Sequence, residues 1–421
     1  MQSKGHKQSQ SREIRQDTLI VGVDVGSQEH EANMTTISNK NLGTLKFTNN
    51  RRGFDEFWSA IMKAKWNAGC RDILLGFEST GTYGEPLQHY LLEKPVKLVQ
   101  VNPMHTKKHK DICDNSPLKS DKKDSQVITD IIKIGRWISL VVPTGDKAIL
   151  RRLSHTREKL VRDRTAHYNR LLQQYGLIFP EFSSVIKNIK SKTAQYLLSK
   201  YPTPDDYGFL SAEELSKELR KVSCGRFGMK QAEALLEAAN SSIFIKQGLY
   251  GILFEIKQIL KQLEYTNSFI AEVEAEIKAT LERVPDSKEI VRIPGLKAMT
   301  VAAVIGEIGD FSAFRTAKEV QKFAGLNLYE ISSGLHKGQV HITKVGRGLL
   351  RKTLYFAALN TVRKGGIMHD YYKSLIDKGK PKTKALIAVS RKLLRIIFAI
   401  VRDNSKFIEN YQETKIMKKA A

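Results

Sequence analysis

The polarity pattern of the first 145 residues alternates between apolar runs of strand length and amphipathic segments of helix length. It predicts strands at residues 19–25, 32–37, 41–47, 73–77 and 96–101, and helices at 50–68 and 86–92. Strands that alternate with helices are typical of an α/β domain with a partly parallel sheet. Because three successive strands come first, we favour an arrangement of the ribonuclease H type over a doubly wound one.

After Pro143 the pattern becomes helical. An amphipathic helix is predicted at residues 148–175, with leucine and tyrosine on one face and arginine on the other. A second long helix carries a heptad seam made of Ile252, Ile256, Ile259, Leu263, Thr266, Ile270, Val273 and Ile277. Such a seam is typical of a coiled coil or a helical hairpin. We favour a contact between subunits, and burial against the 148–175 helix of the same chain is the alternative.

A third, mainly helical region begins near Glu289. Residues 290–305 resemble a helix-hairpin-helix, whose turn offers backbone N–H groups to a phosphate, so Lys297 in this turn is a candidate nucleic-acid contact. Lys297 stands where a second glycine is usual, and a plain helical turn fits nearly as well. Basic amphipathic helices are predicted at residues 348–363 and 382–401. The pattern thus divides the chain into a flexible basic arm (1–17), an α/β domain (18–145), a helical coiled-coil region (146–288) and a C-terminal domain (289–421).

Composition changes this picture mainly through charge. A chain of 421 residues is long enough for two or three domains, and its net charge of +25 is spread along most of its length. A field of that sign favours a polyanionic partner, most simply nucleic acid. A basic protein with solvated lysines is the plainer alternative.

Two further features bear on the cellular compartment. No apolar run approaches the roughly 18–20 residues that cross a bilayer, so no membrane partner is expected. The three cysteines, at positions 70, 113 and 224, are not closely spaced. Their spacing argues against a disulfide framework and against a zinc site, and it fits a reducing cytoplasm.

Four carboxylates are the candidate chemistry of the α/β domain. Asp24 lies within an apolar strand, Glu78 ends another, and Asp121 and Asp124 share one face of a helix that begins near Ser120. A charge among apolar residues is costly unless it is paired or binds a cation, and crowded carboxylates repel one another when no cation is present. Oxygen ligands of this kind suit Mg²⁺ or Mn²⁺. Taken singly, the two helix residues could be a solvated helix start and Glu78 a strand-end charge.

A glycine-rich, basic stretch at residues 323–347 is the second candidate. Ser333 precedes Gly334, which could hold the loop so that the hydroxyl is exposed. The cations around it in sequence are candidate phosphate contacts, namely Lys337, Lys344, Arg347 and Arg351. By itself this pattern indicates a phosphate-binding loop with a structural serine.

A set of short motifs occurs in one order along the chain. The set comprises Val23-Asp24-Val-Gly, Phe77-Glu78-Ser-Thr-Gly-Thr-Tyr83, Val101-Asn-Pro103, Lys119-Ser-Asp121-Lys-Lys-Asp124, Ile293-Pro-Gly295, Phe323-Ala-Gly-Leu326, Ser333-Gly334 and Thr343-Lys-Val-Gly346. Over residues 18–407 this pattern resembles the insertion-sequence-110 family of transposases, described as bridge-RNA-guided recombinases, which includes the Piv-type DNA invertases. The chain departs from the family at Leu328, where the motif Gly-Leu-x-Pro has proline, and in its longer middle region at 182–248.

The resemblance implies a fold and a mechanism. It implies an N-terminal RuvC-like domain whose DEDD acids are Asp24, Glu78, Asp121 and Asp124, and a C-terminal transposase domain whose nucleophile is Ser333, beside Ser332. It also implies that the partners are donor and target DNA, a structured bridge RNA and further copies of the chain, as a dimer to tetramer. The expected location is then the cytoplasm of a bacterial or archaeal cell, at the nucleoid.

Other functions remain open at this point. A Piv-like invertase acting at fixed sites has the same chemistry with a different outcome. A metal-dependent junction nuclease would use the four acids and leave Ser333 structural. A nucleic-acid-binding scaffold without activity is the non-enzymatic alternative, and retention of all four acids argues against it.

Overall fold

The computed structural model describes residues 14–78, 82–113, 121–330, 338 and 340–408. The chain divides into two units, one formed by Met1–Thr144 with Glu307–Ala421 and the other by Gly145–Gly306. Most of the predicted basic arm lies outside the described residues. Every helix in the described part of the chain is too short or too polar to span a lipid bilayer.

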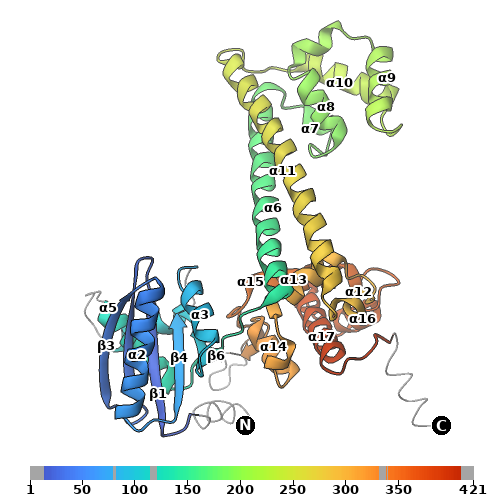
Figure 1. Cartoon of the computed structure of the whole chain (residues 1–421). Helices are drawn as coiled ribbons and strands as arrows, with labels where there is room; N and C mark the ends of the chain where they lie inside the picture. Colours follow the sequence, from blue (N-terminus) through green and yellow to red (C-terminus); the bar gives the residue numbers. More distant parts are fainter. Residues whose placement is uncertain (1–13, 79–81, 114–120, 331–337, 339, 409–421) are drawn as a thin grey trace, which may run out of the picture. The chain divides into compact units, whose positions relative to one another are not determined.

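A six-stranded mixed sheet forms the N-terminal part of the first unit (Figure 1). Its strands lie in the order β3-β2-β1-β4-β5-β6. They are β1 (Thr18–Val25), β2 (Glu29–Thr36), β3 (Asn41–Thr48), β4 (Asp72–Glu78), β5 (Lys97–Val101) and β6 (Trp137–Ser139). β1 pairs antiparallel with β2 and parallel with β4, and β4 pairs parallel with β5. The predicted α/β domain is confirmed, and β6 is a strand that the pattern did not predict.

Helices cover both faces of this sheet, which explains why β1 is apolar from Leu19 to Val23. Leu19, Val21 and Val23 pack on one face in a cluster with residues of α2 (Arg51–Asn67) and α3 (Glu85–Leu92). Ile20 faces the other way, toward apolar residues of α5 (Asp121–Lys133). α4 (Pro103–Cys113) leads from β5 toward α5. The predicted bounds of α2 agree with its caps: Asn50 accepts a hydrogen bond from Gly53 N at 2.9 Å.

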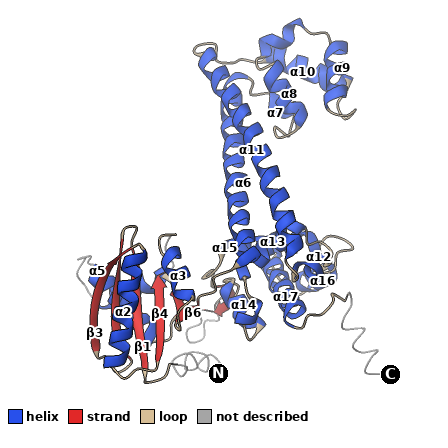
Figure 2. Ribbon diagram, in the orientation of Figure 1, coloured by secondary structure: helices blue, strands red, loops and turns tan. Residues whose placement is uncertain are grey.

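The C-terminal part of the first unit is mainly helical, as predicted (Figure 2). It contains η2 (Phe311–Ala313), α14 (Ala317–Phe323), α15 (Gly348–Thr361), α16 (His369–Asp377) and α17 (Lys382–Arg402). Two short antiparallel strands, β7 (Leu328–Glu330) and β8 (Val340–Ile342), form a separate small sheet. α17 is held to α15 by packing and by the buried Ser390 hydroxyl, which donates to the Leu354 carbonyl at 3.2 Å.

The second unit is built on two long helices, α6 (Gly145–Ile178) and α11 (Leu249–Arg283), which lie side by side (Figure 1). Five short helices join them at one end: α7 (Phe182–Val185), α8 (Lys192–Lys200), η1 (Pro204–Phe209), α9 (Ala212–Val222) and α10 (Met229–Ser241). An aromatic core that includes Tyr175, Phe179 and Tyr207 holds this end together. α12 (Ser287–Val291) and the start of α13 (Ala298–Ile308) follow α11.

The heptad seam is buried within the chain, and the favoured contact between subunits is not what the structure shows. Seven of its eight residues are buried, from Ile256 to Ile277. The facing helix is α6, and Arg157 of α6 forms an ion pair of 2.6 Å with Glu274 of α11. α6 supplies its own apolar stripe, with Leu150, Tyr168 and Leu171 buried. The seam therefore gives no argument for an oligomer.

Candidate active site

Three carboxylates form a row across neighbouring strands of the sheet. The register pairs Val23 of β1 with Phe77 of β4, so Asp24 and Glu78 are neighbours at the ends of parallel strands. On the other side of β1, Asp24 pairs with Glu31 of β2. Paired residues on adjacent strands point to the same face of a sheet. This face is the one that α5 covers, since Val23 and Phe77 lie in the cluster on the opposite face.

Gly22 allows α5 to approach β1 closely. A Cβ atom on Gly22 would lie 2.7 Å from both Ser125 O and Thr129 N, a distance that real Cβ contacts do not show. Glycine at a strand interior is typical of such close backbone contacts. The contact brings the first turn of α5, which carries Asp121 and Asp124, to the end of β1 where Asp24 lies.

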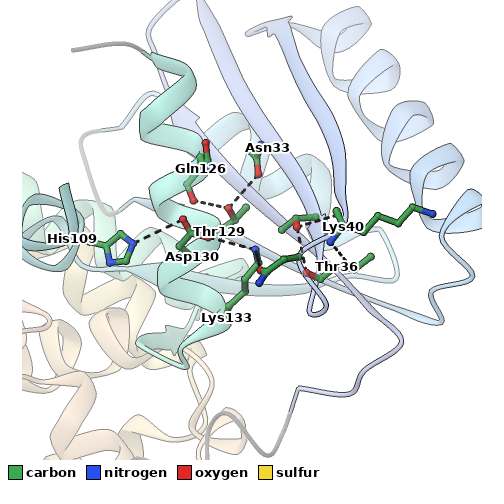
Figure 3. A network of polar contacts seen from close by, with 10 residues as sticks. Asn33, Thr36, Lys40, His109, Gln126, Thr129, Asp130 and Lys133 are labelled. Atoms are coloured by element: carbon green, nitrogen blue, oxygen red, sulfur yellow. Dashed lines mark hydrogen bonds and ion pairs between the residues drawn. The ribbon is translucent and has the colours of Figure 1, made fainter. Parts of the chain in front are cut away.

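Polar contacts tie α5 to the sheet and to α4 (Figure 3). The Thr129 hydroxyl lies 3.2 Å from Asn33 Oδ1 of β2 and 2.6 Å from Gln126 O. Asp130 lies 3.4 Å from Lys133 Nζ and 3.9 Å from His109 Nε2 of α4. These contacts fix the rotation of α5, so the position of its first turn is determined by residues outside the acid row.

The charges of the row interact. Burial raises the pKa of Glu78, and the neighbouring Asp24 and Asp124 carboxylates raise this pKa further. The Lys110 ammonium and a hydrogen bond with Thr106, both from α4, act in the opposite direction. Lys110 Nζ lies 2.5 Å from Asp124 Oδ1. A cation from the protein itself thus balances part of the negative charge at this site.

Glu31 is a carboxylate that the sequence analysis missed. It is 4% exposed, and neither side-chain oxygen has a hydrogen-bond partner within the described part of the chain. Lys46 Nζ lies 3.6 Å from Glu31 Oε2. Such a buried carboxylate is costly without strong compensation. Its only sequence signal is its place opposite Asp24, which becomes visible once the register of β1 and β2 is known.

Asp24, by contrast, is half-buried rather than enclosed among apolar side chains, because β1 ends at the next residue. The structure brings Asp24, Glu78 and Asp124 together, and Asp121 begins α5, although its side chain lies outside the described residues. Among the described side chains, no three His, Cys, Asp or Glu residues converge closely enough to hold a metal ion. The all-oxygen donor set suits Mg²⁺ or Mn²⁺, and the Mg²⁺ or Mn²⁺ site stays a prediction.

Ser333 also stays a prediction, because Ser332, Ser333, His336 and Lys337 lie outside the described residues. The strands that flank this segment are paired: Tyr329 of β7 lies opposite His341 of β8.

The other predicted phosphate contacts differ in their surroundings. Lys344 is exposed and has a left-handed backbone (φ 54°). Arg347 donates to the Val141 carbonyl at 3.3 Å. Arg351 donates to Ala324 O at 3.1 Å, and burial lowers the pKa of its guanidinium, which indicates a structural role. Lys297 belongs to the other unit, in the turn between α12 and α13 where Gly295 has φ 90°.

Comparisons with known proteins point to one family. The profile of the IS110 DEDD family, described as a transposase, matches residues 21–180, and the profile of the transposase IS116/IS110/IS902 family matches residues 287–373. The 44.8 kDa protein of insertion element IS116 from Streptomyces clavuligerus is 24% identical over 93% of this chain and 97% of its own length. The pilin gene-inverting protein of Moraxella bovis is 23% identical over 93% and 98%.

A third relative, the transposase of insertion sequence element IS1111A from Coxiella burnetii, is 23% identical over 72% of this chain and 70% of its own length. The two matched profiles belong to the same kind of protein and cover the acid row, α14 and the strands β7 and β8. The chain belongs to the IS110 family of transposases.

Proposed function

We propose that this chain is the transposase of an insertion sequence, a recombinase that cuts and rejoins donor and target DNA through a covalent link to Ser333. The observation that carries the proposal is the row of carboxylates at the strand ends, completed by the first turn of α5. The net charge of +25 suits partners made of nucleic acid. Two relatives are named as a transposase and a gene-inverting protein, and both names describe DNA rearrangement.

The fold of the first 140 residues supports a RuvC-like domain. An antiparallel meander of β1, β2 and β3 is followed by β4 and β5, which extend the sheet in parallel on the other side of β1. This strand order suits the ribonuclease H type of arrangement that the sequence predicts. In this arrangement Asp24 lies near the end of β1, a strand that pairs with β2 on one side and with β4 on the other.

The ligands of Mg²⁺ or Mn²⁺ would be Asp24, Glu78, Asp121 and Asp124. Bound there, the ion would supply positive charge to a scissile phosphate and to the oxygens that enter and leave. Glu31 would orient the row from the next strand without being a ligand. Lys110 would release Asp124, because an ammonium 2.5 Å from a carboxylate oxygen competes with an ion for the same electron pairs.

Ser333 would act in the transfer itself. Its hydroxyl oxygen forms a bond to phosphorus while the bond from phosphorus to the leaving deoxyribose oxygen breaks. The serine proton passes to a carboxylate or to water, and the leaving oxygen takes up a proton. The phosphoserine link conserves the bond energy for rejoining. Stabilising charge near the phosphate is what the acid row with its ion provides.

We further propose that a structured RNA selects the sites, with one loop pairing to target and one to donor DNA, and that a dimer to tetramer in the cytoplasm brings both DNAs together. The protein then needs mainly contacts with nucleic-acid backbones, for which its 69 lysine and arginine residues are suited. The resemblance in sequence motifs carries this part of the proposal.

A Piv-type invertase is the second candidate function. It is favoured by the match to the pilin gene-inverting protein, which spans 98% of that protein. The two functions share the chemistry of cutting and rejoining and differ in whether the sites are fixed or chosen by RNA.

One experiment tests both the covalent link to Ser333 and the dependence on RNA. Purified protein, RNA from the flanking DNA, Mg²⁺ and labelled donor and target duplexes are mixed, and denaturing gels report any protein–DNA adduct. We expect an adduct with the wild type and none with Ser333→Ala or Asp24→Asn. An adduct without RNA would favour the invertase. Cleavage that survives Ser333→Ala, with no adduct, would leave a metal-dependent nuclease and refute the serine mechanism.

A further inference from the structure

A pocket of about 490 Å³ lies within the first unit, beside the acid row. Four segments line it: residues 100–105 at the end of β5 and the start of α4, 135–138 at β6, 322–323 of α14, and 343–347 after β8. Val101 of this lining pairs with Glu78 in the sheet. The pocket and the acids are therefore adjacent features of one unit.

The charge of the lining is positive. It includes Arg136, Lys322, Lys344 and Arg347, and no acidic side chain is among the described lining residues. Lys322 is exposed at the rim, yet the pKa of its ammonium is lowered, chiefly because the surrounding protein shields it from water. Nearby Glu319 raises this pKa, and Arg136 lowers it. Four cations around one cavity favour an anionic occupant.

Backbone contacts fix the main chain that carries two of these cations. Lys344 N donates to Gly325 O at 3.0 Å, and Arg347 N donates to Phe323 O at 3.0 Å. Gly346 has φ 145°, a backbone conformation that residues with a side chain rarely adopt, and a Cβ atom at this position would collide with Phe323 O. The segment 343–347 is thus fixed against the end of α14. Because this backbone is already ordered, only the side chains of Lys344 and Arg347 need to be ordered when a ligand binds.

Two buried aromatic residues and two enclosed polar atoms also belong to the lining residues of the pocket. Trp137, 4% exposed, and Phe323 form part of its wall, and the Arg347 guanidinium lies 5.2 Å from the centre of the Phe323 ring. His105 Nδ1 and Trp137 Nε1 have no hydrogen-bond partner within the described residues. Both atoms are enclosed by protein, so a ligand in the pocket reaches them only if the lining side chains move.

We propose that this pocket binds one unpaired nucleotide of a nucleic-acid strand, with its phosphate among Arg136, Lys322 and Lys344 and its base against the Trp137 and Phe323 side. The volume exceeds that of a phosphate group and falls within the range of small-ligand sites. A base pair in a stacked duplex does not fit such a cavity, so the nucleotide must leave the stack, which costs least where the strand is already unpaired. The proposal rests on the proposed function and names a nucleotide contact of the same protein.

Binding can be measured without catalysis. Fluorescence anisotropy in EDTA, with the Ser333→Ala protein, compares labelled single-stranded DNA of 12 nucleotides with single-stranded RNA and duplex DNA of the same sequence. The test variants are Lys322→Gln, Lys344→Gln and the two combined. Lys318→Gln is the matched control, since Lys318 is exposed one turn earlier on α14 and does not line the pocket.

We expect the double variant to bind single strands about tenfold more weakly, with a salt slope about 0.7 smaller, because both lysines contact the same phosphate and each phosphate contact on a single strand contributes about 0.7. Duplex binding should change no more than with Lys318→Gln. Comparing the loss for single-stranded DNA with the loss for single-stranded RNA shows which of the two nucleic acids the pocket binds. Equal losses on single strands and duplex, or no loss, would overturn the proposal. Lys344→Gln alone, an exposed change, keeps the test valid if the double variant is unstable.

A photocrosslink gives an independent readout. A strand with 5-iodouracil in place of thymine should crosslink to peptides that contain Trp137 or Phe323, and Lys344→Gln should weaken that crosslink. Crosslinks confined to other peptides would contradict the assignment. Since neither assay needs metal or Ser333, a failed recombination assay would leave this result intact, and the reverse also holds.

Discussion

Replacing Gly22 by alanine tests how the acid row is assembled. The added Cβ would lie 2.7 Å from two backbone atoms of α5, Ser125 O and Thr129 N, and 2.9 Å from the Thr129 methyl group. Backbone atoms of a packed helix cannot rotate away as a side chain does, so α5 must shift as a whole. Overpacking of a core costs about 1–3 kcal/mol, and this site should lie near 3 kcal/mol.

Such a loss lowers the melting temperature by roughly 6–12 °C for a domain of this size. Thermal denaturation measures the loss, and amide hydrogen exchange of α5 shows where it occurs. Because α5 carries Asp121 and Asp124, DNA cleavage should also require more Mg²⁺. Gly176→Ala is the control: it adds the same methyl group in open space on α6 and should be neutral or slightly stabilising. Unchanged stability and unchanged Mg²⁺ dependence of Gly22→Ala would refute the close-contact argument.

Three further predictions follow from single contacts. Lys110→Ala removes the ammonium beside Asp124, so half-maximal cleavage should need several-fold less Mg²⁺. Lys107→Ala, at an exposed position of the same helix, is the control. An unchanged or higher Mg²⁺ requirement would contradict competition between lysine and metal. Glu31→Gln removes a buried charge without hydrogen-bond partners, so thermal stability should hold or rise. Cleavage should fall about tenfold, the low end of what a residue that orients metal ligands contributes; full activity would show that Glu31 is only structural. Leu263→Ala, at a seam position that is 1% exposed, should lower the unfolding free energy of the helical unit by about 2–5 kcal/mol. If only the dissociation of an oligomer were affected, the seam would be a contact between subunits instead.

The elements of the sheet domain could be predicted because local signals agree there. Residue 50 was the expected start of a helix, and Asn50 caps α2 in the structure. The apolar runs at 19–25 and 73–77 correspond to β1 and β4, whose two faces are both covered. The hydrophobic periodicity of the sequence predicts such elements directly, because the burial of each residue depends on its position within one strand or helix.

Pairing between elements could not be predicted in the same way. The heptad seam of α11 shows that a partner exists, but the same apolar residues would fit α6 or a second chain. The expected second strand started at residue 32, whereas β2 starts at Glu29. The predicted strand therefore did not include Glu31, which is the residue opposite Asp24 in the sheet. A side-chain site made by three strands is a property of their register, which polarity alone does not determine.

Helix α4 connects the two features on which the proposals depend. Its neighbouring residues His105 and Thr106 serve different sites: His105 lines the pocket, and Thr106 forms a hydrogen bond with Glu78. One turn later, Lys110 contacts Asp124. A shift of α4 would therefore change the pocket and the charge balance of the acids together. Comparing the Mg²⁺ requirement of wild type and Lys344→Gln, with and without single-stranded DNA, measures this coupling. Thermodynamic linkage requires that any effect of the strand on Mg²⁺ binding equal the effect of Mg²⁺ on strand binding.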